Sequence, residues 1–157
     1  MIKNNERIYI LDTSSILSGK NVNLIDCKLI TTPGVSNEIK PGGKDYEKFE
    51  ILKETGLKIF SPNQLYIKKI KKEAKKTGDI GRLSDTDIEI LALALEFKSK
   101  KEKIIILTDD YSIQNIADTL SIDYENILQS KIKKRFKWIS KCLGCGKKYK
   151  ENINTCP

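Results

Sequence analysis

Two short, uninterrupted apolar runs constrain the fold of this 157-residue chain more than any other feature. The runs Ile8 to Leu11 and Ile104 to Leu107 are each followed at once by polar residues. Apolar runs of this length without polar alternation are typical of strands buried on both faces of a parallel sheet. Because helical patterns separate these runs from further β-prone segments, the sequence predicts an α/β fold: a doubly wound parallel sheet with helices on both faces.

Local patterns predict the remaining elements. The first strand is expected at residues 7–11 and the central one at 103–107, with further strands at 28–32, 57–60 and 122–124. Helices are expected from Pro33 through Ile39 and at 44–54, 63–76, 84–97 and 111–120, with a loop at 77–82. The segment 84–97 is apolar on nearly every side, which predicts a buried helix. The composition changes after Leu128, so we expect one domain at 1–128 and a small second segment at 129–157.

The positive charge of the chain is concentrated near its C-terminus. Residues 130–150 hold nine basic residues and no acid, whereas the rest of the chain has 20 basic residues and 21 acids. Such asymmetry predicts a nucleic-acid partner, although a solubilising tail is the simpler alternative. Aromatic residues among the cations favour RNA binding. The expected RNA-binding residues are Lys133, Lys134, Arg135, Lys137, Trp138 and Lys141. A second lysine run, Lys68 to Lys72, is more typical of a solvated helix face, though it could contact phosphates.

Two absences narrow the possible functions. The chain has no histidine, which excludes a histidine general base or histidine metal ligand. No apolar run approaches the roughly 20 residues needed to cross a bilayer, so we expect no membrane partner and a cytoplasmic protein. The sequence does not indicate an oligomeric state.

Acidic residues recur where strands are expected to end. They are Asp12, Glu38, Asp85, Asp87, Asp109 and Asp110. Each has a structural alternative, because such residues also cap helices or pair with lysines. Four separate segments nevertheless bring acids towards the same edge of a parallel sheet, where binding sites form. Crowded carboxylates take up either a proton or a cation, and all-oxygen ligands suit Mg²⁺ or Mn²⁺.

At this point the motifs become recognisable. The segments ILDTSSIL, TTPGVSNEIK, TGDIGRLSDTDIEILALAL and IILTDDYSIQNIA resemble, in order and spacing, the PIN-domain nucleases over residues 7–125, and within them the Nob family of ribosomal-RNA maturation nucleases. The resemblance implies that Asp12, Glu38, Asp87 and Asp110 are the catalytic acids and the Mg²⁺ or Mn²⁺ ligands. Asp109 is the second choice for the fourth acid. Ser14 and Thr108 match hydroxyl positions that orient the acids, whereas Asp85 is not a pattern position.

The cysteines suggest a zinc site in the tail. Cys142 and Cys145 form a C-x-x-C-G knuckle, half of a zinc ribbon, and Cys156 resembles the start of a second knuckle. We therefore expect Zn²⁺ at these three cysteines, with the fourth ligand unidentified. Cys27 lies in the other domain and is expected to be a small buried residue.

The function hypothesis is a metal-dependent endoribonuclease acting on precursor small-subunit ribosomal RNA. A metal-activated water would attack phosphorus in line and leave a 5′-phosphate and a 3′-hydroxyl. Two alternatives stay open. A VapC-like toxin would cut transfer or messenger RNA but usually lacks the appended knuckle. A non-catalytic RNA-binding or ribosome-binding module would bind RNA without binding a metal at the acids.

Overall fold

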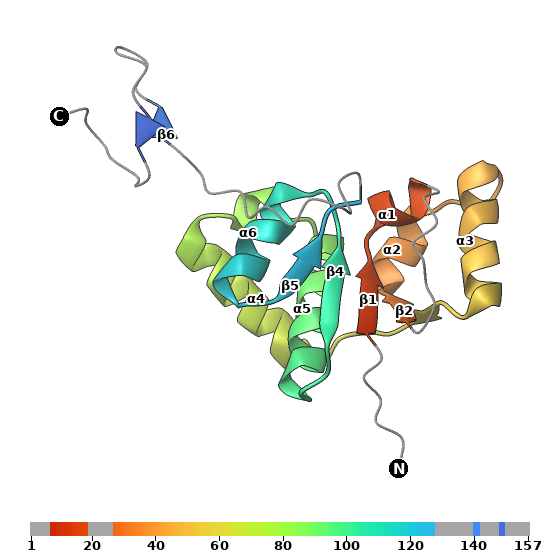
Figure 1. The fold of residues 1–157 in the computed structure, drawn as a ribbon, viewed down its shortest axis with the longest axis horizontal. Coiled ribbons are helices and arrows are strands. Elements are labelled where there is room, and N and C mark those ends of the chain that lie inside the picture. The colour runs from red at the N-terminus through yellow and green to blue at the C-terminus, as the bar shows by residue number, and fades with distance from the viewer. Residues whose placement is uncertain (1–6, 19–26, 128–139, 142–147, 150–157) are drawn as a thin grey trace.

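A five-stranded parallel sheet forms the centre of the molecule (Figure 1). The computed structural model of the chain describes residues 7–18, 27–127, 140–141 and 148–149. The strands are β1 (Arg7–Leu11), β2 (Cys27–Thr31), β3 (Lys58–Ile59), β4 (Ile104–Leu107) and β5 (Asp123–Glu125), in the spatial order β3–β2–β1–β4–β5. The chain runs outwards from β1 through β2 to β3 and then crosses to the other side of β1, which confirms the doubly wound α/β fold.

The helices connect successive strands and cover both faces of the sheet, as predicted. They are α1 (Thr13–Leu17), α2 (Pro33–Glu38), α3 (Lys44–Thr55), α4 (Gln64–Thr77), α5 (Asp85–Ser99) and α6 (Tyr111–Thr119). Several helix and strand ends differ from the predicted ones by one or two residues. The helix from Pro33 ends at Glu38, because Ile39 has extended backbone angles, and the predicted loop at 77–82 contains a 3₁₀ turn, η1 (Ile80–Arg82).

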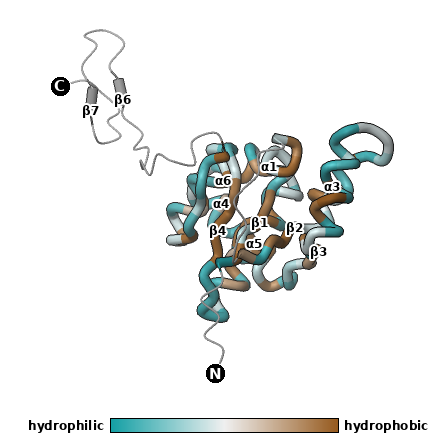
Figure 2. Tube along the Cα trace, turned by 45° about the vertical axis from the view of Figure 1, so that its right-hand side comes forward, coloured by the Kyte–Doolittle hydropathy of each residue, from teal (hydrophilic) through white to brown (hydrophobic). Residues whose placement is uncertain are grey.

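Helix α5 supplies much of the core. It has six fully or almost fully buried apolar residues and packs against β4 and against α2, α4 and α6. Figure 2 shows the apolar segments of the strands and of α5 gathered at the centre of the domain. Burying each large apolar side chain contributes roughly 1.5–3 kcal/mol, so this helix and β1 with β4 hold the sheet together. The prediction of a buried helix is confirmed.

The C-terminal segment is described only at two short strands. Ser140–Lys141 forms β6 and Lys148–Tyr149 forms β7, and the two pair antiparallel. The connection between them contains Cys142 and Cys145. In the described part of the chain, no helix is long and apolar enough to cross a membrane.

Candidate active site

Asp12 stands at the carboxyl end of β1 and is 6% exposed. Its Oδ1 accepts hydrogen bonds from the Ser15 backbone N–H and the Ser14 hydroxyl, both at 2.8 Å, so the carboxylate also caps α1. Its Oδ2 accepts a hydrogen bond from the Thr108 hydroxyl. Burial raises the pKa of the Asp12 carboxyl above its usual range, and these hydrogen bonds oppose the rise. Asp12 is thus a buried acid whose carboxylate is held in one orientation by two hydroxyl groups and a backbone N–H.

Thr108 joins two acids from different parts of the site. It follows β4, is fully buried, and donates to Asp12 while accepting the Asp110 backbone N–H at 3.0 Å. The Asp110 carboxylate is exposed and caps α6 through the Ser112 N–H at 2.8 Å. Asp109 has a different task, since its Oδ1 accepts the Ile127 N–H at 2.8 Å and so fastens the chain beyond β5. Of the two neighbouring aspartates, Asp109 thus holds the chain beyond β5, whereas Asp110 caps α6.

Glu38 reaches the site from the last residue of α2. Its Oε2 accepts a hydrogen bond from the Thr13 hydroxyl, which lies directly after Asp12. The short helix is positioned by Gly34, whose N–H donates to Glu89 of α5 at 2.8 Å. A Cβ atom at Gly34 would lie 2.7 Å from the Glu89 Oε2, so glycine permits this close approach. The Glu38 side chain therefore depends on contacts with both α1 and α5.

Asp87 lies in the first turn of α5 and completes the group. Its carboxylate accepts the Ser84 N–H at 2.9 Å, while the Ser84 hydroxyl accepts the Asp87 N–H at 3.1 Å, which is a capping box. Burial raises the pKa of the Asp87 carboxyl, hydrogen bonds from Ser84 lower it, and the negative charges of Asp110 and Glu38 raise it further. The charges of Glu38 and Asp110 therefore act on Asp87, although the three acids come from different parts of the chain.

Within residues 7–18 and 27–127, the acids Asp12, Glu38, Asp87 and Asp110 have no cationic partner at ion-pair distance. Within the same residues, no group of three or more acids or cysteines is arranged closely enough to hold a metal ion as it stands. The site thus concentrates negative charge at the edge where α1, α5 and α6 begin.

Other predicted site residues lie outside the described part of the chain. These are Cys142, Cys145, Cys156, Lys133, Lys134, Arg135, Lys137 and Trp138. Lys141 belongs to β6, but its side chain is not described. Two neighbours of the acids were not singled out from the sequence: Thr13, which binds Glu38, and Tyr111, whose side chain is 59% exposed directly after Asp110. The hydroxyl run after Asp12 was the available indication for Thr13.

A parallel α/β sheet with acids at its carboxyl edge is typical of nucleotide-binding and phosphate-processing proteins, and comparison with known families gives the specific class. The family described as "PIN domain of ribonuclease" matches residues 9–97. The chain belongs to this family of PIN-domain ribonucleases, and it is an endoribonuclease.

Several archaeal proteins are similar over most of their length. Endoribonuclease Nob1 of Archaeoglobus fulgidus is 37% identical over 150 residues, which cover 96% of this chain and 85% of the relative. Endoribonuclease Nob1 of Methanocaldococcus jannaschii is 41% identical over 143 residues, covering 91% and 68%. Ribonuclease VapC1 of Thermoplasma acidophilum is 38% identical over 149 residues, covering 95% and 73%.

Proposed function

We propose that this endoribonuclease hydrolyses precursor small-subunit ribosomal RNA and that Asp12, Glu38, Asp87 and Asp110 form its metal-binding active site. The site is supported by the hydrogen bonds of Thr108 and by the effect of neighbouring acids on Asp87. The pKa of Asp87 is raised by the charges of Asp110 and Glu38, and Asp110 is tied to Asp12 through Thr108. A capping role for each acid would not by itself require acids of different elements to lie close enough to affect one another's charge.

The donor set fits Mg²⁺ or Mn²⁺, because its side chains offer carboxylate oxygens and neither histidine nor thiolate. Like charges repel, which agrees with the absence of a closed cage among the described acids. A bound divalent ion would supply positive charge and acidify a water molecule near the scissile phosphate. The raised pKa values of Asp12 and Asp87 support this assignment, because burial disfavours their unneutralised charge.

The residues of the chain would divide the work. The Thr108 and Ser14 hydroxyls and the Ser15 N–H fix the Asp12 carboxylate, while Thr13 directs Glu38. In-line attack of water on phosphorus breaks the bond to the 3′ oxygen and leaves a 5′-phosphate and a 3′-hydroxyl. The basic tail would bind the RNA backbone, with Zn²⁺ held at Cys142, Cys145 and Cys156. Phosphate contacts of this kind provide affinity more than sequence choice.

The ribosomal substrate is supported by the similarity to Nob1 endoribonucleases along nearly the whole chain. The similarity to ribonuclease VapC1 supports a second candidate, a toxin-type ribonuclease that cuts transfer or messenger RNA. The basic segment with its C-x-x-C knuckle favours the first.

Cleavage assays test the site and the substrate together. Labelled precursor small-subunit RNA, transfer RNA and messenger RNA are each incubated with Mn²⁺ and wild type, Asp87→Asn or Asp85→Asn. Asp85 is the matched control, because it lies in the same first turn of α5 but is exposed and outside the acid group. We expect cutting of the precursor by wild type and Asp85→Asn only. Equal activity of Asp87→Asn would refute the site, and preferential cutting of transfer or messenger RNA would refute the ribosomal substrate.

A further inference from the structure

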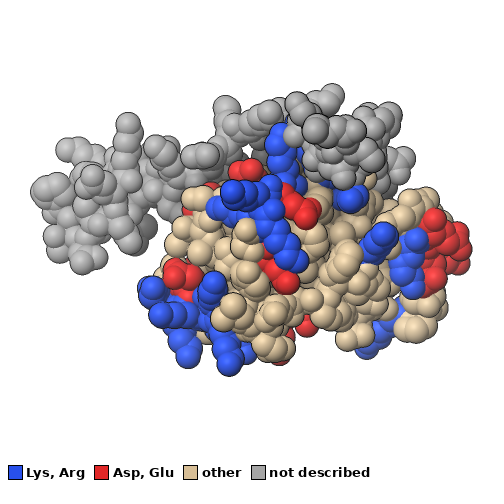
Figure 3. All heavy atoms as spheres, turned by 90° about the horizontal axis from the view of Figure 1, so that it is seen from below, with Lys and Arg blue, Asp and Glu red and all other residues tan. Residues whose placement is uncertain are grey.

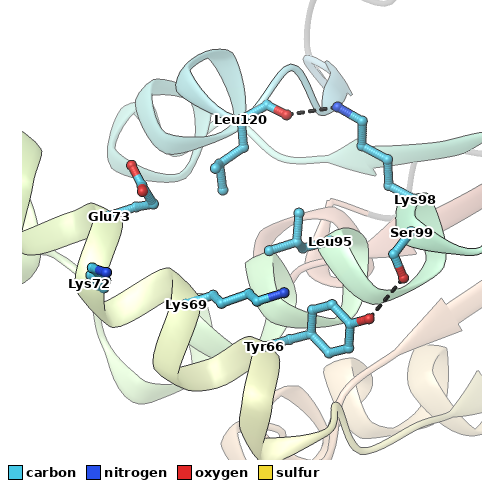
Figure 4. Close-up of a pocket in the computed structure, with 8 residues that line it drawn as sticks. All are labelled: Tyr66, Lys69, Lys72, Glu73, Leu95, Lys98, Ser99 and Leu120. Carbon is cyan, nitrogen blue, oxygen red and sulfur yellow. Dashed lines mark hydrogen bonds between the residues drawn. The ribbon is translucent and has the colours of Figure 1, made fainter.

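A cavity lies between α4, the C-terminal end of α5 and the C-terminal end of α6. Its volume is about 500 Å³, within the usual range for small-ligand sites. Its walls are Tyr66, Leu95, Leu120, Ser99, Glu73 and three lysines, Lys69, Lys72 and Lys98 (Figure 4). The cavity therefore combines an apolar wall with cationic groups.

Hydrogen bonds build the rim of this cavity. The Lys98 ammonium donates to the carbonyl oxygens of Leu120 at 2.7 Å and Ser121 at 2.6 Å, and so links the ends of α5 and α6. The Tyr66 hydroxyl and the Ser99 hydroxyl are 2.9 Å apart, which links α4 to the end of α5. Figure 4 shows both interactions on the side of the cavity formed by the end of α5. These contacts fix Tyr66 and Lys98, which leaves Lys69 and Lys72 as the adjustable cations.

The charge at the cavity is strongly unbalanced. Helix α4 carries six lysines and one glutamate, Glu73, which pairs with Lys76 at 3.3 Å. Lys69 lies 5.1 Å from the centre of the Tyr66 ring, and within the described ranges neither Lys69 nor Lys72 has a carboxylate partner. Figure 3 shows cationic side chains gathered at the left-hand end of the face seen from below, the end at which α4 lies in Figure 1.

The cavity is remote from the acids. Asp87 lies in the first turn of α5, at the acidic edge, and Ser99 at the cavity follows twelve residues later, or about 18 Å along the helix axis. A ligand in the cavity thus cannot be the phosphate that is cut. It can be another part of a long chain that passes over α5.

We propose that this cavity is a second RNA-binding site, in which Lys69 and Lys72 contact a backbone phosphate and the wall of Tyr66, Leu95 and Leu120 packs against the attached nucleoside. The inference extends the proposed function, since it takes an RNA substrate as given. Ammonium groups suit phosphate, and an aromatic wall accepts any base, so the site would increase affinity for RNA without selecting a sequence. The cavity can add to the affinity only for an RNA long enough to extend from the cleavage site to the cavity.

The test compares two double variants of α4 that each remove two positive charges. Lys69→Ala/Lys72→Ala alters the cavity, and Lys68→Ala/Lys71→Ala alters exposed lysines on the same helix outside it. Binding of a fluorescent single-stranded RNA is measured by anisotropy over a salt series, with a chelator present so that the RNA stays intact. We expect the cavity variant to lower the steepness of log affinity against log salt by about 0.7, which corresponds to one neutralised phosphate, and the control to leave it nearly unchanged.

Equal slopes for the two double variants would refute the site, because net charge alone would then explain the binding. Tyr66→Phe keeps the ring and should bind as wild type, whereas Tyr66→Ala, checked for folding by thermal unfolding, should bind more weakly. Equal RNA affinity of Tyr66→Phe and Tyr66→Ala would refute the proposed packing of the Tyr66 ring against a nucleoside. Because binding is measured without cutting, a chain that shows the expected slopes but fails to cut ribosomal precursor would refute the proposed substrate and leave this site standing.

Discussion

Replacing Thr108 with valine isolates the hydroxyl that joins Asp12 to Asp110. The two side chains have nearly the same shape, and Thr108 is fully buried, so Thr108→Val removes the hydrogen bonds without opening a cavity. Asp12 then loses the donor to its Oδ2, and the Asp110 N–H loses its acceptor. We expect lower stability at neutral pH and lower nuclease activity, because the Oδ2 atom of Asp12 is no longer held while Oδ1 keeps its two donors.

The size of the effect follows from the charge of Asp12. A hydrogen bond to a charged group contributes about 1.5–3 kcal/mol, whereas one between neutral groups contributes about 0.5–1.5 kcal/mol. Burial already holds the folded pKa of Asp12 above its ordinary value of 3.8, and loss of the Thr108 bond raises it further. A raised folded pKa means that stability falls as pH rises from the ordinary towards the folded value. The loss caused by Thr108→Val should therefore be about 2–3 kcal/mol at neutral pH and about 1 kcal/mol in acid.

Urea unfolding followed by circular dichroism at neutral pH and near the ordinary carboxyl pKa measures this difference. Thr108→Ser is the control, because it keeps the hydroxyl and loses one methyl group, which costs about 1 kcal/mol at either pH. A pH-independent loss in Thr108→Val, equal to that of Thr108→Ser, would refute the role assigned to the hydroxyl.

Three further results are expected. Asp12→Asn should abolish RNA cleavage, and it should abolish Mn²⁺ binding measured by calorimetry. It should also reduce the fall in stability between pH 3.8, the ordinary pKa of the carboxyl, and neutral pH, since the buried group no longer ionises. An unchanged pH profile of stability would contradict this. Gly34→Ala should cost about 1–3 kcal/mol in urea unfolding and reduce activity by displacing Glu89, whereas Gly81→Ala, with open space around its Cβ position, should be tolerated; similar losses would exclude the close-approach explanation. Tyr111→Ala should weaken RNA binding by about 1–3 kcal/mol and Tyr111→Phe should not, if the exposed ring stacks on a base; equal affinities would exclude stacking.

The fold was largely predictable because its strands and helices are locally consistent. The apolar runs at β1 and β4 and the apolar circumference of α5 identify buried elements without tertiary information. Strand order and helix ends were less accessible. The placement of β4 beside β1 depends on long-range packing, and Ile39 turns extended although its apolar side chain fits the helical pattern, because it packs in the core.

The positions of the candidate acids at one edge of the sheet were predictable from the sequence, whereas their hydrogen bonds were not. Acids after successive parallel strands must approach the same edge, which is a property of the topology. The sequence could not separate Asp109 from Asp110, because their difference lies in the bond from the Ile127 N–H to Asp109. It also offered capping and catalysis as alternatives, and the structure shows that Asp12, Asp87 and Asp110 each take part in capping a helix.

Helix α5 has a mechanical consequence for any long substrate. It is one unbroken element whose two ends reach the two proposed binding surfaces, the acids at Asp87 and the cavity at Ser99. Because the helix fixes the distance between the two contact points, an RNA strand must have a minimum length to reach both at once. Oligonucleotides below that length should lose the benefit of the far contact abruptly and not in proportion to the nucleotides removed.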